Sequence, residues 1–92
     1  MPSVPFQHYS GILVVTLPGQ IDPLIRALAG KPGVTVSIRD PKRDRLIVVL
    51  ESSSRDGLEA LHHSVRALPG VVTADPVVHY VDEHPEEPVP GN

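Results

Sequence analysis

Histidine is the residue type in this sequence best suited to metal binding or proton transfer. The chain has five histidines and no cysteine, so a metal site would depend on imidazole and carboxylate ligands. His62 and His63 are adjacent on an expected helix and point about 100° apart, so one ion cannot easily use both. His8 and His79 lie near the ends of two expected strands that antiparallel pairing would bring together. A histidine pair without a third ligand is a weak metal site, and we expect neither a metal nor another cofactor.

The other charged residues do not form a pattern typical of catalysis. Asp40 and Asp44 flank a basic turn, an arrangement more typical of a solvated hairpin than of a catalytic dyad. No Ser/His/Asp spacing and no glycine-rich phosphate loop is present, so we expect a protein that is not an enzyme. A small basic cluster surrounds the turn, made of Arg39, Lys42, Arg43 and Arg45. The net charge of −3 and the lack of stacking aromatic residues argue against nucleic-acid binding.

Length and composition limit the chain to one small domain. It has 92 residues, 40% of them hydrophobic but only 3% aromatic, so valine, leucine and isoleucine must form the core. The N-terminus has no basic region followed by an apolar run, so we expect no signal peptide, no membrane insertion and a cytoplasmic location. We expect an N-terminal extension at 1–7, one domain at 8–81 and a disordered tail at 82–92, where prolines and acidic residues predominate.

Two stretches of the sequence repeat each other and predict how the domain is built. The aliphatic runs Ile12–Val15 and Leu46–Val49 are 34 positions apart, and the corners Pro32–Val34 and Pro69–Val71 are 37 positions apart. Each unit shows the pattern of a strand, a helix, a Pro-Gly-Val corner and a second strand. Two such units predict an α+β sandwich of β-α-β-β-α-β order, with a four-stranded sheet and two helices on one face. We expect the first and third strands to be central and parallel to each other.

The segments at the ends of the two units support this arrangement. The turn at 40–44 predicts that the two middle strands form a hairpin. In the last expected strand, at 71–81, Pro76 removes a ladder donor. That strand should therefore lie at an edge of the sheet or contain a bulge.

Aliphatic residues occupy both sides of the two central strands, which is unusual for a sheet covered on one face only. The polar residues Thr16 and Glu51 indicate which side of each strand is open. By this criterion an apolar patch lies on the open face, made of Ile12, Val14, Ile47 and Val49. Burying four such side chains would yield roughly 6–12 kcal/mol, while association costs roughly 4–15 kcal/mol. The patch therefore predicts a partner-binding or self-association surface that needs added charge or backbone pairing.

Four segments taken together resemble one known family. They are SGILVV at Ser10–Val15, PGVTV at Pro32–Val36, LIVVLE at Leu46–Glu51 and PGVVTADPVVH at Pro69–His79. In order and spacing they are similar to the NapD family, the cytoplasmic assembly chaperones of the periplasmic nitrate reductase. The resemblance implies a ferredoxin-like fold. It also implies binding of the twin-arginine signal peptide of the catalytic subunit, which holds back export until the molybdenum cofactor is inserted.

The resemblance and the patch together lead to a hypothesis for the binding site. The apolar segment of the peptide would lie as a helix across the open face, and its arginines would meet carboxylates, with Glu51 first and Asp75 second. The expected peptide-binding residues are Ile12, Val14, Thr16, Ile47, Val49 and Glu51. Pairing along the edge strand Val34–Arg39 is an alternative mode of binding, and we expect the free chain to be a monomer or a weak dimer.

Two other protein classes share this fold. A ligand-sensing domain of the ACT-like or leucine-responsive kind would form a stable dimer through its sheet and bind amino acids. An acylphosphatase-like enzyme would need an arginine in a phosphate-binding loop after the first strand, and Leu17–Gln20 has none.

Overall fold

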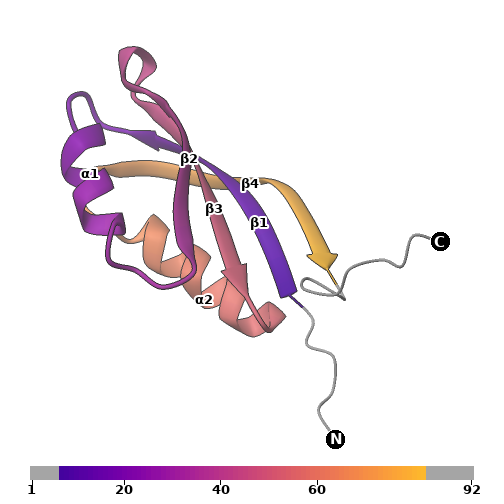
Figure 1. Ribbon diagram of the computed structural model, residues 1–92. Helices are drawn as coiled ribbons and strands as arrows, with labels where there is room; N and C mark the ends of the chain where they lie inside the picture. The colour runs from indigo at the N-terminus through magenta and orange to yellow at the C-terminus, as the bar shows by residue number, and fades with distance from the viewer. Residues whose placement is uncertain (1–6, 83–92) are drawn as a thin grey trace, which may run out of the picture.

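The computed structural model describes residues 7–82, which form one four-stranded sheet with two helices (Figure 1). The elements follow the order expected from the repeat. They are β1 (Gln7–Thr16), α1 (Ile21–Leu28), β2 (Val34–Asp40), the short 3₁₀ helix η1 (Pro41–Arg43), β3 (Arg45–Ser52), α2 (Arg55–Arg66) and β4 (Val71–Asp82). This is the ferredoxin-like fold. Most of the N-terminal extension and of the acidic tail expected at 1–7 and 82–92 lies outside the described residues.

The sheet has the strand order β2-β3-β1-β4, so β1 and β3 are central and β2 and β4 are the edges, as expected. The expected parallel pairing of β1 with β3 is wrong, because the two strands are antiparallel, with Ile12 opposite Val48. The tight turn through η1 makes β3 run opposite to β2, and the α1 crossover makes β2 run in the same direction as β1. Every neighbouring pair in the sheet is therefore antiparallel.

The two helices cover one face of the sheet, and each packs against it with an apolar stripe. In α1 the buried residues are Ile21, Leu24 and Leu28, and in α2 they are Leu58 and Val65. The α2 helix begins after Ser54, whose hydroxyl accepts a hydrogen bond from the Gly57 amide at 3.0 Å, the usual form of an N-cap. The sheet residues that pack against these stripes are Ile12, Val14, Leu46, Val48, Leu50 and Ala74.

The two Pro-Gly corners make equivalent backbone contacts in the two repeats. Gly33 and Gly70 adopt φ of 78° and 88°, a region that side chains rarely tolerate. Their carbonyl groups accept hydrogen bonds from Glu51 N at 2.8 Å and Leu17 N at 2.9 Å. Each corner therefore joins its repeat to the central strand of the other repeat.

The Pro76 prediction is confirmed in both respects. β4 is an edge strand, and its register with β1 shifts between Gly11, which is opposite Val78, and Ile12, which is opposite Pro76. Val77 is the extra residue, so β4 is bulged where proline cannot donate. The bulge changes which β4 side chains face the open side.

Candidate functional site

The structure corrects half of the face assignment made from the sequence. Ile12, Val14 and Thr16 were expected on the open face, but all three are buried, with exposed fractions of 1%, 0% and 4%. Ile12 and Val14 belong to the core under the helices and cannot contact a partner while the chain is folded. On β3 the assignment holds, because Leu46, Val48 and Leu50 are buried and the alternate residues face the other way.

Thr16 explains why the polarity criterion failed on β1. Its hydroxyl donates to Leu17 O at 2.9 Å and lies 3.3 Å from Asp44 O, so burial leaves no polar atom unpaired. A satisfied threonine can occupy a core position, and its polarity then carries no information about solvent. The repeat contained the correct signal, since an offset of 34 aligns Ile12 with Leu46 and thus with the core.

The uncovered side of the sheet is still apolar at its centre. The residues that β1 contributes there differ from those expected from the sequence. Half-buried side chains come from both central strands, and more exposed ones flank them at the two edges. We call this surface the open face; its apolar members are Leu13, Val15, Ile38, Ile47, Val49 and Val78.

Ile38 and Val78 were not found by sequence reasoning, because each follows an irregularity in an edge strand. A register shift between Val36 and Ile38 brings Ile38 opposite Ile47 on the open side. On β4 the bulge places Val78 opposite Gly11, and a Cβ on Gly11 would come within 2.8 Å of the Val78 side chain. Val78 therefore lies over the glycine. Val78 and Ile38 are both more than half exposed, at 54% and 58%.

One end of the open face is hollowed. A depression of about 270 Å³ is lined by Leu13, Ile38 and Ile47, with Asp40 and Arg45 at its rim. Asp40 lies 3.4 Å from Arg43 and 3.6 Å from Arg45, so its charge is already compensated. The depression has the size and lining to receive an apolar side chain.

The uncompensated carboxylates lie elsewhere on this surface. Glu51 is exposed, is opposite Tyr9 in the register and accepts a 2.7 Å hydrogen bond from Gln7 Nε2. Asp75 is exposed and is opposite Leu13. Neither makes an ion pair within residues 7–82. The open face thus combines an apolar centre with two carboxylates that can receive cations from a partner.

The comparisons with known proteins identify the family. The profile described as "NapD protein" matches residues 7–83, which is most of the chain. This chain belongs to the NapD family. The match covers every strand and helix described above, so NapD membership applies to the whole folded unit. A comparison with curated protein sequences gave no match.

A solved structure supports the same family. The solution structure of the E. coli Tat proofreading chaperone protein NapD is similar to this chain, with a TM-score of 0.75 and 27% sequence identity. The similarity covers 94% of this chain and 90% of that one. Family and fold are thus those of a chaperone. Neither helix in the described part of the chain has the length or apolar content needed to cross a bilayer.

Proposed function

We propose that this protein is a cytoplasmic chaperone that binds the twin-arginine signal peptide of the periplasmic nitrate reductase catalytic subunit. Binding would withhold the subunit from export until its cofactor is inserted and folding is complete. NapD membership across the folded unit is the observation that supports the proposal most directly.

The open face has the chemistry that such a peptide requires. Twin-arginine signal peptides join a pair of arginines to an apolar segment. The apolar segment would lie across Leu13, Ile47 and Val49, with one of its side chains in the depression beside Ile38. An amphipathic helix on an apolar surface is a common form of peptide recognition.

Charge would supply the specificity. Glu51 and Asp75 are the carboxylates of the open face without an ion pair in the described residues, and both are exposed to an incoming ligand. Arginine binds a carboxylate with two parallel hydrogen bonds, whereas lysine offers a point charge. The half-buried aliphatic residues provide only part of the free energy, because association itself costs about 4 kcal/mol or more.

The same surface would determine the oligomeric state. In this proposal the free chain is a monomer or a weak dimer that associates through the open face. The peptide would compete with that contact, because both would cover Ile47 and Val49.

Calorimetric titration with a synthetic twin-arginine signal peptide tests the proposal, with a twin-lysine peptide as the comparison. We expect micromolar or tighter binding of the first and about tenfold weaker binding of the second. Glu51→Gln should reduce the preference for arginine, and Glu59→Gln, the same charge change on the helix side, should not. Absence of binding to both peptides would refute the proposed function.

A further inference from the structure

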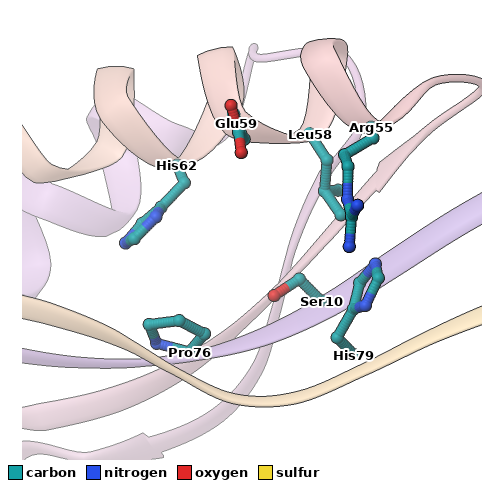
Figure 2. Close-up of a pocket in the computed structure, with 7 residues that line it drawn as sticks. All are labelled: Ser10, Arg55, Leu58, Glu59, His62, Pro76 and His79. Atoms are coloured by element: carbon teal, nitrogen blue, oxygen red, sulfur yellow. The ribbon is translucent and has the colours of Figure 1, made fainter.

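A second pocket lies on the helix-covered side of the sheet, between α2 and the strands β1 and β4 (Figure 2). Its volume is about 240 Å³. We call it the α2 pocket; its polar lining residues are Ser10, Arg55, Glu59, His62 and His79. The sheet separates it from the open face, so it is no part of the proposed peptide site.

The fold brings these residues together from three elements. Ser10 on β1 and His79 on β4 are opposite each other in the strand register, so their side chains point to the same side of the sheet. Arg55 is the first residue of α2, and its guanidinium faces His79 across the pocket in Figure 2. His62, two turns further along α2, donates from Nε2 to Ala74 O at 2.6 Å, which holds its ring at the other end.

Arg55 and His79 make no ion pair in the described part of the chain, although Glu59 also lines this pocket. Within residues 7–82 the two ion pairs both involve Asp40 at the distant β2–β3 turn, and neither Arg55 nor His79 takes part in one. The His79 ring stacks on the His8 ring, with centroids 6.1 Å apart and planes inclined by 16°. His8 Nδ1 is buried and finds no hydrogen-bond partner among the described residues. The Arg55 guanidinium and the His79 imidazole thus lie at the pocket without an ion pair, and the His8 ring stacks beside His79.

Ser10 adds an unpaired hydroxyl group to the floor of the pocket. Ser10 as a whole residue is only 6% exposed, and its hydroxyl makes no hydrogen bond with the described residues. In Figure 2 this hydroxyl lies in the space between the α2 side chains above and the β4 side chains below. The hydroxyl oxygen is not among the buried polar atoms of the described residues that lack a partner, so it is reachable from the pocket. A ligand atom in the pocket could therefore accept a hydrogen bond from this hydroxyl.

We propose that the α2 pocket binds a phosphate group, either free or as a small phosphate monoester. The Arg55 fork, the His79 imidazole and the Ser10 hydroxyl offer donors from different directions, which suits a tetrahedral oxyanion better than a planar carboxylate. The first turn of α2 adds the positive end of its dipole, which the Asp56 carboxylate in the same turn partly offsets. Glu59 at the same pocket opposes the anion and moderates the affinity.

Nuclear magnetic resonance of the full chain labelled with ¹⁵N tests this proposal. Inorganic phosphate and glycerol 3-phosphate would be added in separate titrations at ionic strength held constant with sodium chloride. We expect saturable shifts of the Ser10, Arg55 and His79 amides, and the tighter of the two titrations identifies free or esterified phosphate as the preferred form. Shifts that do not saturate, or that sodium chloride alone reproduces, would overturn the proposal.

Paired variants separate a built site from general charge attraction. Arg55→Gln should weaken binding about tenfold, because it removes a charge-assisted contact. Arg66→Gln makes the same charge change in the last turn of α2 and should change affinity by less than about twofold. Ser10→Ala should weaken binding about threefold or more, and Glu59→Gln should tighten it. Equal effects of Arg55→Gln and Arg66→Gln would contradict the site, and signal-peptide binding would be unaffected by that result.

Discussion

The two faces of the sheet have similar composition, but the helices cover only one of them. Val48 and Val49 are neighbours on β3, yet Val48 is fully buried under the helices and Val49 is half-buried on the open face. The stripes of α1 and α2 can cover one side only. Apolar content alone therefore does not define a core. The side that the helices cover provides stability, and in our proposal the other side provides binding.

The largest expected effect comes from charging the covered face. Val48→Asp would place a carboxylate at a position with 0% exposure and no partner, a change that costs about 4 kcal/mol or more. We expect the chain to lose cooperative unfolding in urea, followed by circular dichroism. Val14→Asp should behave in the same way, since Val14 is equally buried. A wild-type unfolding midpoint in either variant would contradict the assignment of the faces.

The adjacent substitution should separate binding from stability. Val49→Asp leaves the core intact, so we expect a loss of about 1 kcal/mol in the free energy of unfolding. Affinity for the twin-arginine peptide should fall about tenfold or more, because the carboxylate would be desolvated under the apolar segment. Ala60→Glu, which adds the same charge on the exposed side of α2, serves as the control for calorimetry. Wild-type affinity in Val49→Asp would exclude the open face as the site.

A smaller effect should distinguish the buried threonine of β1 from an exposed one. Thr16→Val removes the hydroxyl that satisfies the Leu17 carbonyl, and we expect about 1 kcal/mol of destabilisation in urea denaturation. Thr35→Val changes an exposed side chain on β2 and should alter stability by less than about 0.5 kcal/mol. If the two variants are equally stable, the buried hydroxyl does not contribute as the geometry indicates.

The smallest expected change in stability concerns the contact between Gly11 and Val78 on the open face. Gly11→Ala would push the Val78 side chain, which has room to rotate, so we expect less than about 1 kcal/mol of destabilisation. Gly30→Ala meets no atom and should be neutral or slightly stabilising, by about 0.4–1 kcal/mol. Thermal unfolding measures both. A stabilising Gly11→Ala would show that Val78 does not lie over the glycine.

Several features of the fold could be predicted from residues that interact with their neighbours in sequence. The hairpin followed from the turn at 40–44, and the bulged edge strand followed from Pro76. The direction of β3 relative to β1 was predicted wrongly, although the hairpin and the crossovers together determine it. The turn and proline signals were reliable, the strand direction was wrong because they were not combined, and the polarity of Thr16 was misleading on β1.

The sequence by itself determined the order of the elements and the central and edge strands, because periodicity and turns act over a few residues. The order and spacing of four segments indicated the NapD family. The polarity of its side chains gave the wrong buried side for β1, and the tertiary structure decided it. Both sides of that strand are aliphatic, and the carbonyl of Asp44 that accompanies Thr16 in the core arrives through folding. The α2 pocket was decided in the same way. Ser10, Arg55 and His79 are far apart in the chain, and only the pairing of β1 with β4 under α2 brings them together.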